Sequence, residues 1–268
     1  VAQQDTIRFI FIGHCYQDGA GGTKVDYRVE SFDFSGYQGV WLGGDVCSEA
    51  MLDYSTVQYI DSLFDLGNPD THWSLGNHDA RNGNWEWYEE FSGRKTWHAY
   101  SSYGITRFVL NTNLVPTDCE SLNDQYEKLI NTIDTVSSGN RLVLIMHHGI
   151  WRDVPGLPAP PNYAQSDLTY WNANCFAMGN TFVETVYPHL VDAKERGVEI
   201  FCILGDMGAG PKSIDYLSDD GIHFLGCGLD HNEPEDKVLV FTLDKSSNEL
   251  TYKYYLINDL LSSQVISP

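Results

Sequence analysis

Short apolar segments that end in glycine, aspartate or histidine recur along the sequence and alternate with segments of helical periodicity. This alternation is typical of a layered α/β domain rather than of a sandwich made of strands alone. The sequence therefore predicts an α/β fold. We expect strands at Ile7 to Ile12, Gly39 to Leu42, Thr71 to Leu75, Ile105 to Asn111, Arg141 to His147, Glu199 to Leu204, Ile222 to Gly226 and Lys237 to Leu243, with Glu249 to Ile257 as the hairpin partner of the last.

Two helices are predicted from the spacing of apolar residues. The first covers Leu122 to Val136, and Ser121 with an acidic residue three positions later resembles a capping box at its start. The second begins with the same pattern at Thr181 and ends at Gly197, a residue type that commonly terminates helices. Pro188 lies inside this second helix and is expected to kink it.

The stretch from 149 to about 180 contains four prolines and several aromatic residues. It is too long for an ordinary connection inside a compact domain. We interpret it as a lid-like insertion, with a variable surface excursion as the alternative. A chain of 268 residues, 42% of them apolar, can form one large domain or two small ones. We expect a single domain over residues 1–268.

Polar clusters follow the apolar runs at several points, and in open α/β sheets ligands gather outside the carboxyl ends of the strands. One such residue alone is usually a cap or a turn residue, but repetition in one chain favours a shared site. Oxygen and imidazole ligands suit Mn, Fe or Zn. The clusters are Gly13-His14-Cys15-Tyr16, Gly43-Gly44-Asp45, Gly76-Asn77-His78-Asp79, His147-His148 and Gly205-Asp206.

The motifs Gly44-Asp45, Gly76-Asn77-His78-Asp79 and His147 resemble, in their order, those of the calcineurin-like metallophosphoesterases. The resemblance covers the chain from about residue 7 to residue 241. It implies a four-layer α/β/β/α sandwich with a two-metal site at one edge. It also implies that Asp45 bridges both metals, that Asn77 and His147 bind the second one, and that His78 is an acid near the leaving group, held by Asp79.

These residue types suit the implied chemistry. Two cations can activate a shared water and stabilise an in-line displacement at phosphorus. Neutral Asn77 can bind a metal without repelling a phosphate. His78 can protonate a leaving alkoxide, and a neighbouring carboxylate would favour its charged form. The alternative for Asp79 is a helix cap.

The first and last motifs depart from the family pattern. Asp-x-His at the first strand is replaced by His14 and Tyr16, and the late Gly-His-x-His becomes Gly205-Asp206-Met207-Gly208. Tyr16 is either an unusual ligand or an ordinary packing residue. We therefore expect one nearly complete metal site and one that is weak or unusual, with divalent or trivalent ions, one or two per chain. The expected ligands are His14, Asp45, Asn77, His147 and Asp206.

Three further histidines are weaker candidates. His148 follows a ligand position and is assigned either to substrate binding or to a supporting role. His231, in the Asp230-His231-Asn232 sequence, is a second candidate for substrate binding, with an ordinary turn as the alternative. His98 is expected to be structural.

The charge and the cysteines limit the partners and the compartment. The 16 basic and 37 acidic residues give a net charge of −21, which disfavours a nucleic-acid polymer as partner. No apolar window is long enough to span a bilayer, so no membrane insertion is expected.

Cys119 and Cys175 lie in polar stretches and either pair or remain free thiols; the other four cysteines are expected to be free. The missing initial Met favours export, with a cloning artefact as the alternative.

The combined prediction is a metal-dependent phosphoesterase. It would hydrolyse a phosphomonoester or phosphodiester of a small phosphorylated substrate through a metal-activated hydroxide. The alternative is a catalytically degenerate protein of the same fold that binds a metal or an anionic ligand without turnover, because a fold alone does not guarantee its usual activity. The sequence does not indicate an oligomeric state.

Overall fold

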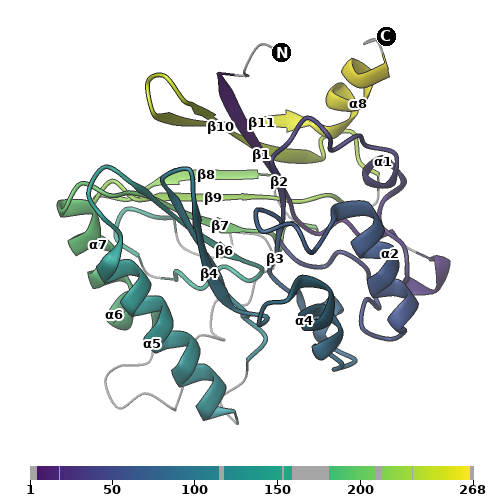
Figure 1. The fold of residues 1–268 in the computed structure, drawn as a ribbon, viewed down its shortest axis with the longest axis horizontal. Helices are drawn as coiled ribbons and strands as arrows, with labels where there is room; N and C mark the ends of the chain where they lie inside the picture. The colour runs from purple at the N-terminus through teal and green to yellow at the C-terminus, as the bar shows by residue number, and fades with distance from the viewer. Residues whose placement is uncertain are drawn as a thin grey trace.

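The computed structural model describes residues 5–17, 19–114, 118–152, 154–158, 181–208, 213–230 and 232–265. Two β-sheets stack face to face, and helices cover the outer face of each (Figure 1). The predicted four-layer α/β/β/α architecture is therefore confirmed.

The first sheet is built around β1, which pairs with β2 in parallel and with β10 in antiparallel orientation. Its inner strands are short apolar runs with buried side chains on both faces, as in a sheet covered on both sides. The spatial order is β11 (Glu249–Leu256), β10 (Lys237–Asp244), β1 (Thr6–Ile12), β2 (Gly39–Leu42) and β3 (His72–Trp73).

The second sheet has a parallel centre with one antiparallel strand at each edge. All six side chains of β6 are buried, which explains why the five residues after Arg141 are all apolar. The spatial order is β4 (His98–Ser102), β5 (Ile105–Val109), β6 (Arg141–Met146), β7 (Glu199–Leu204), β9 (His223–Cys227) and β8 (Ser213–Leu217).

The apolar side chains form a separate core between each pair of layers. Phe9, Trp41 and Phe201 belong to the core between the two sheets. The outer core of the first sheet includes side chains of α1 (Tyr27–Glu30), α2 (Tyr54–Phe64), α4 (Glu86–Ser92) and α8 (Ile257–Val265). The outer core of the second includes α5 (Cys119–Thr135), α6 (Phe182–Thr185) and α7 (Tyr187–Glu195). Two single turns, η1 (Ala20–Gly22) and α3 (Asn77–Ala80), lie in loops.

The predicted elements differ from the structure in several ways. The first predicted helix begins earlier, at Cys119, because the Asp118 side chain accepts the backbone N–H of Ser121 and is the N-cap. The second is divided at Val186 into α6 and α7, so Pro188 stands near the start of a new helix, where proline is tolerated. Strands β4 and β8 and helices α1, α2, α4 and α8 were not predicted.

The carboxyl ends of the two sheets meet at Gly43 and Gly205. A Cβ atom on Gly205 would overlap the backbone of Gly43, so only glycine permits this approach. The Asp206 N–H and the Gly205 N–H both donate to the carbonyl of His147, which links the ends of β6 and β7. The loops that follow β1, β2, β6 and β7 are thus brought to one edge.

Two predictions from the sequence, the lid and the single domain, stay predictions. Most of the predicted lid, namely residues 153 and 159–180, lies outside the described residues. The single-domain assignment also stays a prediction.

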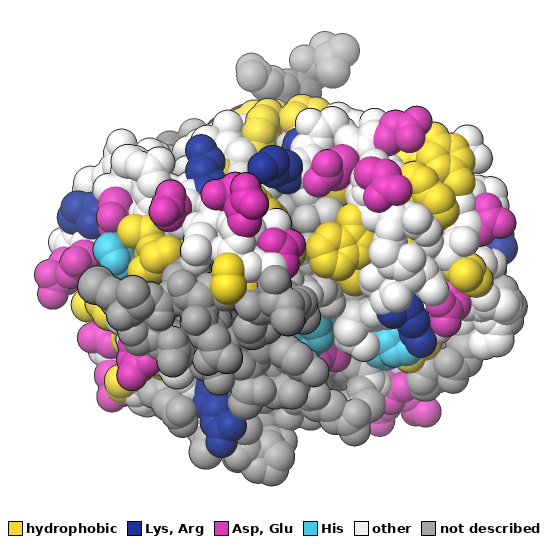
Figure 2. Space-filling view, turned by 90° about the horizontal axis from the view of Figure 1, so that it is seen from below, with side chains coloured by type: hydrophobic (Ala, Val, Ile, Leu, Met, Phe, Trp, Pro, Cys, Tyr) yellow, Lys and Arg dark blue, Asp and Glu magenta, His cyan; other side chains and the backbone are white. Residues whose placement is uncertain are grey.

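In the part of the chain that the structure describes, no helix combines the length and apolarity needed to span a membrane. On the face shown in Figure 2 the acidic side chains are dispersed rather than gathered in one patch.

Candidate functional site

His147 is the centre of the site. It follows β6 directly and is fully buried. Its Nδ1 atom lies 2.7 Å from the carbonyl oxygen of Gly43. Because a carbonyl only accepts hydrogen bonds, Nδ1 carries the proton and Nε2 of the neutral ring presents a lone pair. This is the arrangement in which histidine usually binds a metal.

Three oxygen atoms surround His147 Nε2. Asn77 Oδ1 lies 3.1 Å away, Asp45 Oδ1 3.5 Å and Asp206 Oδ1 3.8 Å. Donor atoms about 2.1 Å from a tetrahedrally bound ion are about 3.4 Å apart. The residues therefore fit a metal ion around His147 by chemical type and by their distances from Nε2. Asn77 is exposed and the Asp206 side chain is 17% exposed, so this side of the cluster is open to solvent.

Asp45 is held in an unusual backbone conformation. Its φ angle is +53°, in the left-handed region that non-glycine residues seldom adopt. Such strain persists where surrounding contacts fix it, commonly at functional sites. Here the Asp79 carboxylate lies beneath the turn and accepts five N–H groups, which come from the backbone of Asp45, Val46, Cys47 and Gly76 and from the indole of Trp73.

Asp79 thus differs from its expected role. Both of its oxygens accept hydrogen bonds beneath the Asp45 turn, so it does not hold the His78 ring. Asp79 is the third residue of α3, and its side chain accepts the N–H of Gly76, the N-cap residue of that helix. This is close to the alternative prediction that Asp79 caps a helix. Burial, and then the Asp45 charge, raise the pKa of Asp79, whereas the N–H donors oppose that rise.

The first predicted metal site has His14 as its main feature. His14 Nδ1 lies 3.0 Å from the carbonyl oxygen of Leu229, and Nε2 lies 3.7 Å from Asp45 Oδ2. His14 therefore shares Asp45 with His147, from the opposite carboxylate oxygen. A Cβ atom at Gly208 would overlap the His14 ring, so the glycine makes room for this histidine.

Tyr16 packs between two histidine rings. Its ring is stacked on His78 at 4.9 Å and tilted against His14 at 4.6 Å. This geometry supports the alternative in which Tyr16 is an ordinary packing residue rather than a metal ligand.

His78 contacts two residues that were not predicted from the sequence, Arg81 and Ser48. Its Nδ1 contacts the Arg81 guanidinium and lies 3.3 Å from Ser48 Oγ. Because a guanidinium only donates, Nδ1 accepts and the proton of the neutral ring is on Nε2. Burial lowers the pKa of His78; the Asp45 carboxylate opposes this shift and Arg81 adds to it. A nearby carboxylate thus favours the charged ring, as expected, but it is Asp45, and burial outweighs it, so the pKa of His78 lies below its usual value. The one available signal was that Arg81 lies three residues after His78.

His148 lies closer to the metal-ligand cluster than expected. Within the described residues, His147, His148 and Asp206 each offer a ligand atom, and these atoms all lie within 4.8 Å of one another. His148 Nδ1 is 2.8 Å from Thr112 Oγ1, which follows the end of β5. The structure thus places His148 as a further ligand candidate beside its predicted assignments to substrate binding or support.

The charges of the cluster depend on one another. Burial opposes the ionisation of Asp45, but the nearby rings of His147, His14 and His78 keep its pKa below the usual value. Burial likewise opposes protonation of His147, yet Asp45 and Asp206 raise its pKa. The predicted ligands His14, Asp45, Asn77, His147 and Asp206 are therefore brought together by the structure. His231 lies outside the described residues.

The structure describes five of the six cysteines. Cys15, Cys47, Cys202 and Cys227 are free and buried, as expected. Cys119 is disulfide-bonded, which agrees with the pairing alternative. Its expected partner, Cys175, lies outside the described residues.

Comparison by sequence gives no family: no protein-family model matches the chain, and no curated protein matches it significantly. The fold is similar to the crystal structure of a dimetal phosphatase from Danio rerio, with a TM-score of 0.57 and 13% identity over 92% of this chain and 98% of that one. A 5'-nucleotidase precursor from Thermus thermophilus gives a lower TM-score of 0.45 and 12% identity, over 96% of this chain and 58% of that one. The chain therefore shares its fold with that dimetal phosphatase. Membership of the calcineurin-like metallophosphoesterases stays a prediction.

Proposed function

We propose that this chain is a metal-dependent phosphoesterase that acts on a small phosphorylated substrate. The observation that carries the proposal is the convergence of Asn77, Asp45 and Asp206 on the Nε2 atom of His147. The fold shared with a dimetal phosphatase agrees with it. Mn, Fe and Zn all suit these nitrogen and oxygen donors, with one or two ions per chain.

In this proposal Asp45, Asn77, His147 and Asp206 hold one ion, and His14 with Asp45 holds part of a second. Ions bound there would supply positive charge at the phosphoryl group and a water of lowered pKa. The chain fixes the ligands in place: the Gly43 carbonyl orients His147, the Leu229 carbonyl orients His14, and Asp79 supports the Asp45 turn.

His78 supplies the N–H of Nε2 to the substrate. Arg81 and Ser48 occupy Nδ1, and Tyr16 stacks on the ring, so the ring has a fixed orientation. A neutral imidazole N–H at this point donates a hydrogen bond to a phosphoryl or leaving-group oxygen. Neutral Asn77 on the exposed side lets an anionic substrate approach without an added negative charge.

The proposal is tested by hydrolysis of p-nitrophenyl phosphate and bis(p-nitrophenyl) phosphate with added Mn or Zn. We expect Asp45→Asn and His78→Ala to abolish or strongly reduce the rate. The matched control is Asp53→Asn, at the exposed N-cap of α2, where Asn caps equally well. Hydrolysis that is unchanged in both site variants would show that the reaction occurs elsewhere.

One observation favours the alternative function, a protein of the same fold that binds a metal or an anionic ligand without turnover. Among the described residues, the predicted second site has four donor residues, His147 and the three around it, whereas the predicted first has His14 and the shared Asp45. Elemental analysis of the wild type and of Asp45→Asn separates the two functions. Metal that is bound and lost in the variant, with no hydrolysis of either ester, would favour the binding protein.

A further inference from the structure

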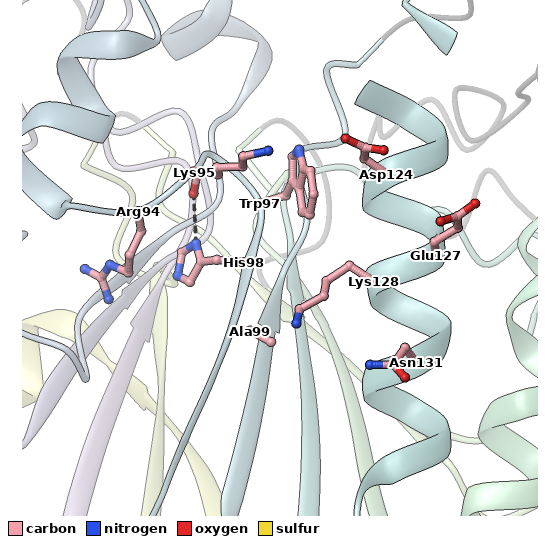
Figure 3. A pocket seen from close by; sticks show the side chains of 9 residues that line it. All are labelled: Arg94, Lys95, Trp97, His98, Ala99, Asp124, Glu127, Lys128 and Asn131. Carbon is pink, nitrogen blue, oxygen red and sulfur yellow. Dashed lines mark hydrogen bonds between the residues drawn. The ribbon is translucent and has the colours of Figure 1, made fainter. Parts of the chain in front are cut away.

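An open surface pocket, called the cavity below, has a volume of ≈ 580 Å³ and lies between β4, with the segment before it, and helix α5 (Figure 3). None of the proposed metal ligands lines it. Small-molecule sites usually have volumes of about 300–1,000 Å³, with apolar walls and a few polar groups. The cavity therefore has the size of a ligand site, and it is separate from the cluster of proposed metal ligands.

The apolar wall of the cavity is Trp97 together with Ala99. The Trp97 indole is half-buried and packs against Leu114 and Leu122. Because these leucines hold the ring, its position costs little further ordering when a ligand arrives. A held indole beside a methyl group is a surface for a planar aromatic ring.

Two lysines supply the positive charge. Lys95 Nζ lies 4.9 Å from the centre of the Trp97 ring. Lys128 is four residues after Asp124 on α5, a spacing at which opposite charges commonly pair. It instead extends across the gap toward Ala99 (Figure 3). Within the described part of the chain, neither lysine forms an ion pair with a carboxylate.

The other charged groups at the cavity narrow the ligand class. Arg94 points away from α5, and its guanidinium donates to the carbonyls of Leu66 and Pro69, so it is not available to a ligand (Figure 3). Asp124 and Glu127 line the helix side and repel ligands with a high negative charge. This favours a single carboxylate over a phosphate.

His98 contributes a fixed wall rather than a ligand contact. Its Nδ1 lies 3.0 Å from the Lys95 carbonyl oxygen, and its Nε2 lies 3.1 Å from His72 Nδ1. Both ring nitrogens are therefore engaged within the protein. The ligand's charge has to be met by the lysines.

We propose that this cavity binds a planar aromatic monocarboxylate. The aromatic ring packs on Trp97 and Ala99, and the carboxylate lies between the ammonium groups of Lys95 and Lys128. Nothing in this proposal requires hydrolysis or a bound metal, so it stands or falls separately from the phosphoesterase.

The test is titration calorimetry with 2-naphthoate in the presence of EDTA, on the full chain and on Asp45→Asn, so that binding at a metal is excluded. We expect a dissociation constant of about 1 mM or lower, as for a ligand of about a dozen heavy atoms. Naphthalene-2-methanol, which lacks the charge, and cyclohexanecarboxylate, which lacks the aromatic ring, should each bind at least about five-fold more weakly, roughly the loss of one favourable contact.

Variants locate the binding. Lys128→Gln, at an exposed position that tolerates the change, should weaken 2-naphthoate binding at least about five-fold, and Lys24→Gln, a lysine elsewhere on the surface, should have no effect. In the NMR spectrum the Trp97 indole N–H signal, identified by its loss in Trp97→Leu, should shift on binding. Absence of saturable binding, an unmoved Trp97 signal, or equal effects of Lys128→Gln and Lys24→Gln would each overturn the proposal.

Discussion

Asp79→Asn tests whether the carboxylate beneath the Asp45 turn organises the site. Its Oδ1 accepts two N–H groups and its Oδ2 accepts three. The side-chain NH2 of asparagine must replace one of these oxygens, so at least two buried donors would then face another donor. Hydrogen bonds to a charged group contribute about 1.5–3 kcal/mol each, which gives a loss of about 3–6 kcal/mol.

Relief of the repulsion from Asp45 offsets part of this loss. We therefore expect the free energy of unfolding to fall by about 3 kcal/mol, and the melting temperature by about 6–12 °C for a chain of this size. The assay is urea and thermal unfolding at pH 8, with Asp53→Asn as the control that leaves both values unchanged. A variant as stable as the wild type would refute the reasoning, because asparagine would then match a carboxyl group that is already protonated.

Three other predictions are independent of that one. Gly208→Ala should displace the His14 ring and lower the number of Mn ions bound per chain in elemental analysis, with an unchanged number as the contrary result. Burial lowers the pKa of His98 to about 4 from 6.5, so protonation favours the unfolded chain and stability falls as the pH drops from about 6.5 toward 4. By pH 5 the loss is about 2 kcal/mol, and urea unfolding of His98→Gln should show a flatter pH dependence; equal slopes would contradict it. Thiol titration of the denatured, unreduced protein should find four thiols, and finding six would exclude the Cys119 disulfide.

The fold was largely predictable because its inner strands are continuous apolar runs. β2 and β7 have the predicted bounds, since burial on both faces leaves a strong signal. The edge strands β4 and β8 include polar and exposed residues, so they resemble loops in the sequence. Pairing with residues of the neighbouring strand, rather than an apolar run, defines them.

The site was predictable as far as its ligands follow strands. Asp45, His147 and Asp206 come shortly after β2, β6 and β7, and parallel strands bring their ends to one edge. The contacts around them were not predictable, because they join residues far apart in the chain. Asp79 under the Asp45 turn and the Leu229 carbonyl on His14 are both of this kind.

The position of β1 also has a consequence for biosynthesis. Thr6 lies opposite Asp244 in the register of β1 and β10, so a strand made among the first residues pairs with one made near residue 240. During translation one edge of β1 stays unpaired, and an unpaired edge is a template for association with other chains. Such distant pairing also slows folding. His14, which follows β1 and donates to the Leu229 carbonyl, therefore acquires its fixed position only after most of the chain has left the ribosome.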